Sequence, residues 1–244
     1  MKKIAFFDAK PYDKIWFEKL NKDYNFNILY FENKLNENTA ILAKECDAVI
    51  AFVNDEINKG TIDELYKHGI KILAMRSAGY NNVDMKAARG KVKVVRVPDY
   101  SPHAVAEHTM ALLLSINRKI HRAYSRTRDR NFSINGLIGY DLYGKTIGVI
   151  GTGKIGKAFI EICKGFGLNI LAYDLYPSDG LGVEYVTLGE LFEKSDIISL
   201  HCPLTKDTYH IIDNKSIDLM KRGVNIINKS SGALKDTQVL LDAI

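Results

Sequence analysis

The sequence has no long hydrophobic run. No apolar stretch approaches the roughly 18 residues needed to cross a bilayer, so we expect no transmembrane helix. The start of the chain has only four apolar residues in a row, Ile4 to Phe7, before Asp8. Such a run is too short for a signal peptide. We interpret it as a first β-strand and expect no membrane partner.

Cysteine is also scarce. The three cysteines, Cys46, Cys163 and Cys202, are odd in number and far apart. They therefore form neither a disulfide framework nor a metal-ligand spacing, and we expect no bound metal. This usage favours a reducing compartment, so we expect a cytoplasmic protein.

Neither sign of charge is in large excess. Lys and Arg number 34 against 29 Asp and Glu, for a net charge of +5. This balance indicates a nucleic-acid partner only weakly, and we expect none. The one dense basic stretch, from Arg118 to Arg130, is typical of a solvated helix end followed by a loop.

Repeats, low-complexity segments and long linkers are absent as well. Short apolar runs instead alternate with helical patterns, which predicts βαβ units around parallel sheets. We expect strands over 3–8, 27–31, 48–53, 70–75 and 93–97, and in a second series over 146–150, 169–174, 197–201 and 224–228. We expect helices over 13–20, 61–67, 154–166, 188–194, 214–220 and 236–244.

A long helix is expected between the two series. Ser101 is a suitable N-cap, and Pro102 stands at the first helical position. Residues 104–116 are apolar on nearly every side, which predicts a helix buried between layers or against a partner subunit, with His108 packed in the core. Residues 125–144 are expected to form a connection.

A glycine-rich loop opens the second series. Gly151-Thr152-Gly153-Lys154-Ile155-Gly156 follows the expected strand 146–150 and precedes a helical pattern. In this context Gly151 permits a tight turn, Gly153 admits a pyrophosphate to the backbone, and Gly156 allows the helix to pack on the strand. The helix N-terminus then offers N–H groups to the phosphates.

An acidic residue completes this pattern. Asp174 ends the next strand, 23 residues after Gly151. A carboxylate there accepts hydrogen bonds from the adenosine ribose and repels a 2′-phosphate. The sequence therefore predicts a Rossmann-type site for NAD rather than NADP.

Several segments together resemble the D-isomer-specific 2-hydroxyacid dehydrogenases, most closely their D-lactate dehydrogenase branch. The resemblance runs through the whole chain in order. The segments are Arg76-Ser77-Ala78-Gly79-Tyr80-Asn81-Asn82-Val83-Asp84, Val97-Pro98-Asp99-Tyr100-Ser101-Pro102, Ala104-Val105-Ala106-Glu107-His108, Tyr143-Gly144-Lys145-Thr146-Ile147-Gly148-Val149-Ile150-Gly151 and Ser199-Leu200-His201-Cys202-Pro203-Leu204-Thr205.

The resemblance implies an α/β fold of two Rossmann-like or flavodoxin-like parallel-sheet domains with a cleft between them. Residues 1–100 would form the substrate domain and residues 101–244 the NAD-binding domain. Relative to the family we expect a C-terminal truncation: the second domain would be incomplete, and the substrate domain would lack its return segment. A homodimer through the 101–122 helix and the cofactor domain is implied too.

The resemblance also assigns site residues. Ala78 and Gly79 would hold the substrate carboxylate through backbone N–H groups, with Tyr100 at the same pocket. The substrate would be a small 2-keto or 2-hydroxy acid. Besides the glycines and Asp174, the expected cofactor contacts are Lys154, Ile155, Cys202, Pro203, Thr208, Lys229 and Ser230.

The catalytic residues depart from the family pattern. Ser231 stands where the family has an arginine, and a serine cannot grip a carboxylate at two points. Lys229, two residues away, offers a point charge that is a poor copy of a guanidinium. The family's glutamate and histidine would lie beyond Ile244, and none of the six histidines matches that histidine.

The sequence thus predicts an NAD-dependent oxidoreductase of the D-lactate/pyruvate type by family, with little activity in this chain. Two alternatives remain open: a non-catalytic NAD(H)-binding, redox-sensing module with the stretch Arg118 to Arg130 as a partner surface, and a decayed enzyme remnant.

Overall fold

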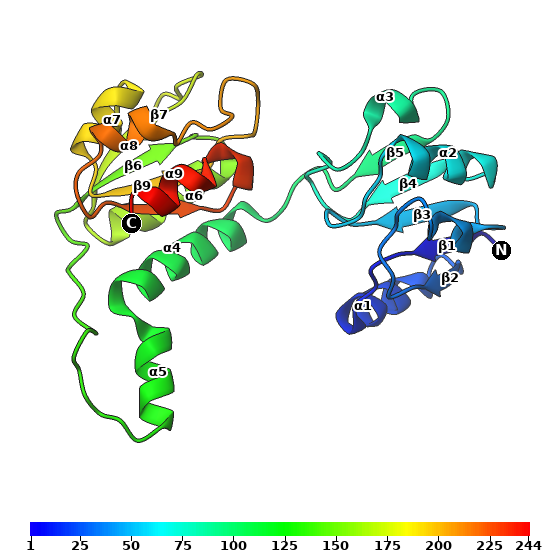
Figure 1. Cartoon of the computed structure of the whole chain (residues 1–244), viewed down its shortest axis with the longest axis horizontal. Helices are drawn as coiled ribbons and strands as arrows, with labels where there is room; N and C mark the ends of the chain where they lie inside the picture. Colours follow the sequence, from blue (N-terminus) through cyan, green and yellow to red (C-terminus); the bar gives the residue numbers. More distant parts are fainter. The chain divides into compact units, whose positions relative to one another are not determined.

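The computed structural model describes residues 1–244 and places them in two compact units, Met1–Tyr100 and Ser101–Ile244. Each unit contains one five-stranded sheet whose strands are all parallel, with helices packed against it (Figure 1). The expected α/β class with two parallel sheets is confirmed. None of the helices combines the length and apolar character that spanning a bilayer requires.

The sheet of the first unit has the strand order β2-β1-β3-β4-β5, which is that of flavodoxin-like folds. Its strands are β1 (Lys3–Phe6), β2 (Asn27–Tyr30), β3 (Ala48–Ala51), β4 (Ile72–Met75) and β5 (Lys93–Arg96). Its helices are α1 (Pro11–Asn21), the 3₁₀ helix η1 (Ala40–Ala43), α2 (Lys59–Lys67) and α3 (Met85–Ala88).

One face of this sheet is closed. Ala5, Val49 and Leu73 occupy neighbouring positions of one row and are fully buried. Side chains from η1, α2 and α3 join them in a single apolar cluster. Because side chains alternate along a strand, the intervening row of residues must point to the other face.

The other face is covered only in part. Phe6 is fully buried there and packs edge-on against Phe17 of α1, with ring centroids 4.8 Å apart. Further along the same row Ile50 is half-buried, and Val95 on the edge strand β5 is 51% exposed. Helix α1 therefore shields one side of this face and leaves the β4–β5 side open to solvent.

The sheet of the second unit has the order β10-β9-β6-β7-β8. Its strands are β6 (Thr146–Ile150), β7 (Asn169–Tyr173), β8 (Glu184–Tyr185), β9 (Ile197–Leu200) and β10 (Asn225–Asn228). Its helices are α4 (Pro102–Arg118), α5 (Ile120–Arg128), α6 (Lys154–Gly165), α7 (Leu188–Lys194), α8 (Asn214–Leu219), the 3₁₀ helix η2 (Gly232–Leu234) and α9 (Thr237–Asp242).

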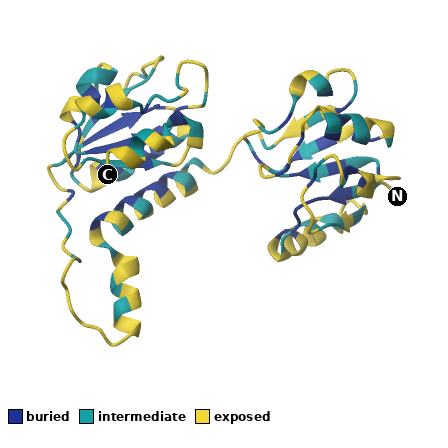
Figure 2. Ribbon diagram, in the orientation of Figure 1, coloured by how far each residue is buried: buried dark blue, intermediate teal, exposed yellow.

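Two apolar clusters cover the two faces of this second sheet. Buried residues of α4 and α6 form one of them with β6, and α7 with the partly buried side chains of α8 and α9 forms the other. Figure 2 shows the central strands of this unit as its most buried part. The sheet is therefore sandwiched, as doubly wound folds require.

Helix α4 corrects one prediction. Ser101 caps it as expected, accepting a hydrogen bond from the Ala104 N–H at 3.3 Å. Only one face is buried, however, by Ala106, Thr109, Met110, Leu113 and Asn117. His108 and Ile116 are exposed, so within this chain the helix is not buried on all sides and His108 is not a core residue.

The connection expected over 125–144 begins later in the structure, after Arg128. Helix α5 continues to Arg128, and none of its residues is buried (Figure 2). The short elements η1, α3, β8 and η2 were not predicted from the sequence, since each has only two to four residues and too little periodicity to detect.

Candidate functional site

The carboxyl ends of β6 and β9 meet at the centre of the second sheet. These two strands are neighbours although two other strands separate them in sequence, so the strand order reverses direction between them. His201 donates its backbone N–H to Ile150 O at 2.7 Å, and Gly151 donates to Tyr173 O at 2.8 Å. In parallel α/β sheets, ligands bind in the crevice at this switch point.

The three glycines of the loop after β6 differ in their surroundings. Gly151 has φ +97°, and a Cβ there would lie 2.6 Å from the Cys202 nitrogen. A Cβ on Gly156 would lie 2.0 Å from the Gly151 carbonyl oxygen. A Cβ on Gly153, by contrast, would meet nothing within 4 Å. Two glycines thus permit close packing of the protein on itself, and the third leaves space for a ligand.

Helix α6 begins at this open position. Gly153 is its N-cap, and no side chain caps the helix. The N–H groups of the first turn, including those of Lys154 and Ile155, have no carbonyl partner within the helix. They carry the positive end of the helix dipole, which suits a phosphate. The loop therefore fits a pyrophosphate.

Asp174 follows β7 and faces the same loop. One carboxylate oxygen accepts from the Thr152 N–H at 2.6 Å and from the Thr152 hydroxyl at 3.0 Å, and the other accepts from the Tyr176 N–H at 2.9 Å. Burial alone would raise the pKa of Asp174, but these hydrogen bonds outweigh it and hold the pKa below its ordinary value. Asp174 is therefore ionised at neutral pH.

The loop after β9 supplies the opposite wall of the switch point. Cys202 is buried, and burial raises the pKa of its thiol, so it is a packing residue rather than a nucleophile. The Thr208 hydroxyl donates to Pro203 O at 2.6 Å and accepts from the Thr205 N–H at 2.8 Å. Thr208 therefore closes this loop on itself, and its direct contact with a cofactor stays a prediction.

The segment after β10 lies next to that wall. The Ser230 hydroxyl donates to Leu200 O at 3.3 Å. The Asn228 side-chain amide donates to Ser231 O at 2.9 Å and accepts from the Ser230 N–H at 2.9 Å, which fixes the turn. Lys229 is exposed, and the half-buried Ser231 makes no side-chain hydrogen bond. Nothing in this segment offers a planar, two-point cation.

The three expected substrate residues lie together in the first unit. The Ala78 N–H donates to the Tyr100 hydroxyl at 2.8 Å, and Ser77 donates to Gly79 O at 2.7 Å. Arg96 donates to Ala78 O at 2.9 Å. The Ala78 N–H that was expected to hold a carboxylate is thus occupied by Tyr100, which a bound carboxylate would have to displace.

Arg76 anchors this loop, a role that sequence reasoning missed. Its guanidinium donates to Asp8 O at 2.6 Å and to Phe7 O at 3.2 Å, and lies 3.3 Å from an Asp13 carboxylate oxygen. The side chain is almost completely buried. The signal in the sequence was a charged residue directly after an apolar strand, but its partners are more than 60 residues away and no local pattern identifies them.

His201 is the only histidine at the switch point. It is half-buried, packs against Phe159, and its Nε2 lies 2.9 Å from the Ser199 hydroxyl. Burial lowers the pKa of His201 to about 4. It is therefore neutral at pH 7 and carries no proton to donate as an imidazolium.

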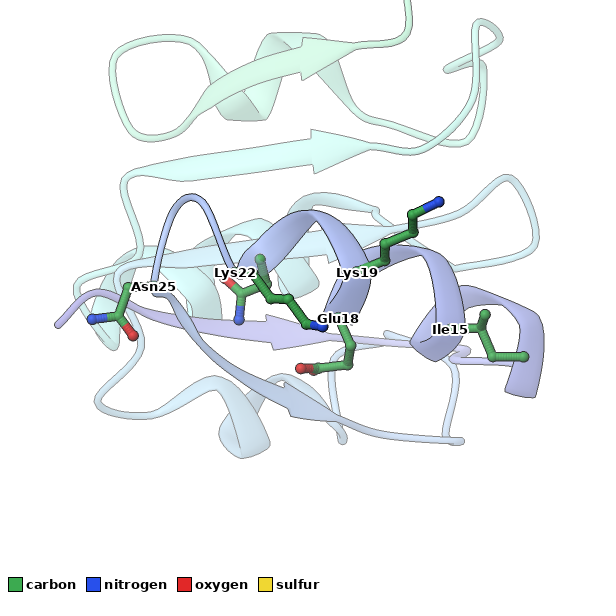
Figure 3. Close-up of a pocket in the computed structure, with 6 residues that line it drawn as sticks. Ile15, Glu18, Lys19, Lys22 and Asn25 are labelled. Carbon is green, nitrogen blue, oxygen red and sulfur yellow. The ribbon is translucent and has the colours of Figure 1, made fainter.

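A shallow depression on α1 is not a candidate site. Its lining residues all come from this one helix and the turn after it (Figure 3). The labelled side chains spread apart along the helix and do not converge on a common point. No group of histidine, cysteine and acidic residues is arranged to hold a metal ion.

Comparisons with known proteins agree with this geometry. Residues 110–244 match the family model described as D-isomer specific 2-hydroxyacid dehydrogenase, NAD binding domain. A D-lactate dehydrogenase of Escherichia coli is 51% identical over 99% of this chain, which spans 75% of that protein. A 2-hydroxyacid dehydrogenase homolog of Haemophilus influenzae is also 51% identical, with 74% of its length covered.

Solved structures are similar over the same extent. The apo-structure of Escherichia coli D-lactate dehydrogenase superposes with a TM-score of 0.94 at 52% identity, covering 99% of this chain and 78% of that one. An NAD-complexed D-isomer specific 2-hydroxyacid dehydrogenase of Lactobacillus delbrueckii superposes with a TM-score of 0.77 at 30% identity, covering 99% and 75%.

Proposed function

The chain belongs to the D-isomer specific 2-hydroxyacid dehydrogenase family, and from this premise we propose that it holds NAD(H) at the β6–β9 switch point but turns over D-lactate or pyruvate slowly or not at all. The observation that carries the binding half is the open space above Gly153, beside the ionised Asp174. The observation that carries the other half is Ser231 at the family's arginine position.

Different residues of the second unit contact different parts of the cofactor. The N–H groups at the start of α6 take the pyrophosphate, with Lys154 and Ile155 contacting it by backbone. Asp174 accepts a hydrogen bond from the adenosine ribose, and Cys202 and Pro203 lie under the ring systems. When bound, the nicotinamide supplies the hydride chemistry.

The residues of the first unit take the substrate. A carboxylate displaces the Tyr100 hydroxyl from the Ala78 N–H and gains the adjacent Gly79 N–H, and consecutive N–H groups of this kind form an anion nest. Arg96 holds the loop through the Ala78 carbonyl, and Arg76, at the start of the loop, is held by the Asp8 carbonyl. A nest of this size suits a small 2-keto or 2-hydroxy acid.

Two groups that turnover needs are missing from the residues described above. Ser231 offers a single hydroxyl where a two-point cation would orient and polarise the substrate. The one histidine at the switch point, His201, has a pKa of about 4 and does not act as the proton donor at pH 7. General acid–base catalysis alone contributes roughly 10²- to 10⁴-fold in rate.

The test uses the 244-residue chain in two assays. Calorimetry with NADH should show binding, and NADH oxidation with pyruvate should run at least about 100-fold below the usual dehydrogenase rate of about 10 s⁻¹. Turnover near 10 s⁻¹ would overturn the inactive half of the proposal. Absence of NADH binding by a folded chain would overturn the binding half.

We also propose a cytoplasmic homodimer. All three cysteines are free, which favours a reducing compartment. Exposed apolar residues lie on α4, on α5 and in the loop after them, and a second copy of the chain would cover them. We therefore favour a place for the basic helix α5 in the dimer interface over its role as the partner surface of a redox sensor.

A further inference from the structure

A chain of hydroxyl groups crosses the carboxyl ends of three neighbouring strands in the second unit. Tyr185 comes from β8, where it pairs with Ala172 of β7. Its hydroxyl donates to the Thr152 hydroxyl at 3.0 Å, in the loop that follows β6. The Thr152 hydroxyl in turn donates to Asp174 at 3.0 Å. No role in the family resemblance accounts for Tyr185 or for the Thr152 side chain.

The direction of these hydrogen bonds is fixed. An ionised carboxylate only accepts, so the single Thr152 proton must go to Asp174. The Thr152 oxygen then has only lone pairs to offer, and Tyr185 must donate to it. The Tyr185 oxygen accepts from the Ser178 N–H at 3.0 Å, which leaves its one proton for Thr152. Each of these two hydroxyls therefore accepts a hydrogen bond from the group before it and donates its own proton in the direction of Asp174.

The loop between β7 and β8 is held by the same chain. Ser178 lies in that loop, and its hydroxyl also accepts from Lys157 of α6 at 2.7 Å. The loop is thus tied to the glycine-rich loop through Tyr185 and to the helix through Lys157. Asp174 stands at its start, with both carboxylate oxygens held by donors on either side.

We propose that the Tyr185 and Thr152 hydroxyls are positioning groups that orient the Asp174 carboxylate toward the adenosine ribose, and so set the preference for NADH over NADPH. The inference rests on the proposed NAD site. A fixed carboxylate accepts a ribose hydroxyl without losing rotamer freedom on binding. The same fixed charge cannot turn away from a 2′-phosphate, so the unwanted cofactor is repelled.

The experiment compares NADH and NADPH binding by calorimetry on the full chain and its variants. Tyr185→Phe and Thr152→Val each remove one hydroxyl and keep the shape of the side chain. We expect each to raise the Kd for NADH about three- to tenfold, the size of one hydrogen bond, while the Kd for NADPH stays the same or falls. Thr152→Ser keeps the hydroxyl and should keep the wild-type preference for NADH over NADPH.

Tyr143→Phe is the matched control. It removes the same atom from the same unit, but Tyr143 is 81% exposed and its hydroxyl has no hydrogen bond to the protein. It should leave both Kd values unchanged. Thermal unfolding of each variant separates folding defects from binding effects.

The outcomes separate this inference from the proposed function. If the two hydroxyls had a purely structural role, their loss would weaken the binding of both cofactors equally. An unchanged ratio of the Kd for NADH to the Kd for NADPH would therefore overturn the inference while leaving the NAD site intact. The same holds if Tyr185→Phe behaves like Tyr143→Phe. If the folded wild-type chain binds neither cofactor, the proposed NAD site itself fails, and the inference fails with it.

Discussion

His201 couples the stability of the second unit to pH. Burial lowers its pKa to about 4 from an ordinary value near 6.5, so between these limits the unfolded chain binds a proton that the folded chain excludes. Stability therefore falls as the pH falls from 6.5 to 4. From this group we expect a loss of about 3 kcal/mol in the free energy of unfolding between pH 7 and pH 4.

Urea unfolding at a series of pH values measures this dependence. His201→Gln cannot titrate and should lose the slope between pH 6.5 and 4. The pKa values of Asp174 and Asp196 are lowered in the folded chain, so their contributions are lost below about pH 4, outside this window. Equal slopes for the variant and the wild-type chain would show that His201 is not the group responsible.

Two glycines of the same loop should respond differently to a methyl group. Gly156→Ala places a Cβ against the Gly151 carbonyl, so the backbone must move. We expect the variant to lose about 1–3 kcal/mol of stability and also to lose NADH binding. Gly153→Ala enters open space at an ordinary φ of −65°. It should leave the melting temperature near that of the wild-type chain and still abolish NADH binding, because the methyl fills the space for the pyrophosphate.

Calorimetry and thermal unfolding of this pair check the assignment of the loop. Retained NADH binding in a well-folded Gly153→Ala chain would contradict the proposed place of the pyrophosphate. Because the two substitutions add the same group three residues apart, differences between them reflect location rather than chemistry.

At the scale of elements, the two faces of the first sheet predict different tolerance to polar groups. Val49 is fully buried on the closed face, whereas Val95 is about half exposed on the open side of the other face. Val49→Thr buries a hydroxyl and should cost about 1–3 kcal/mol. Val95→Thr should change the free energy of unfolding by less than about 0.5 kcal/mol, since the new hydroxyl reaches water.

Chemical denaturation of the two variants checks this contrast. The substitution and the unit are the same, and the two sites differ in the covering of the face and in the place of the strand, since β3 is central and β5 lies at the edge of the sheet. A large cost at Val95 would mean that this face is buried in the protein in solution.

The elements themselves were largely predictable. Apolar runs and helical periodicity located every strand of four residues or more, and the N-cap Ser101 followed by Pro102 marked the start of α4 correctly. The sequence did not show which side of α4 is covered within the chain, because composition alone does not say whether a neighbour exists for each side of a helix. Its buried side chains face α6, and only the structure identifies that partner.

At the scale of the whole molecule, the candidate site was predictable where its residues are local in sequence. The glycine-rich loop and Asp174 belong to one βαβ unit, so their spacing carries the geometry. Three contacts join residues that are 22 or more positions apart: Ala78 with Tyr100, Arg76 with Asp8 just after β1, and Tyr185 with Thr152. No periodicity or spacing records such contacts.

A second copy of the chain is the expected cover for the exposed apolar surface of the second unit. Phe132, Ile134 and Ile138, in the loop after α5, are each at least 75% exposed, and Ile120 and Tyr124 of α5 are more than half exposed. Leaving these apolar side chains in water is unfavourable, and burying them between two copies recovers about 25 cal/mol per Å². We therefore expect a dimer in sedimentation velocity, with Phe132→Asp/Ile138→Asp shifting it to the mass of one chain. Tyr24→Asp, which places one such aspartate at an exposed aromatic of the first unit, should leave the dimer intact. A wild-type chain that sediments as a monomer at all concentrations would contradict the proposed homodimer, and the cover of this surface would then have to be a different partner.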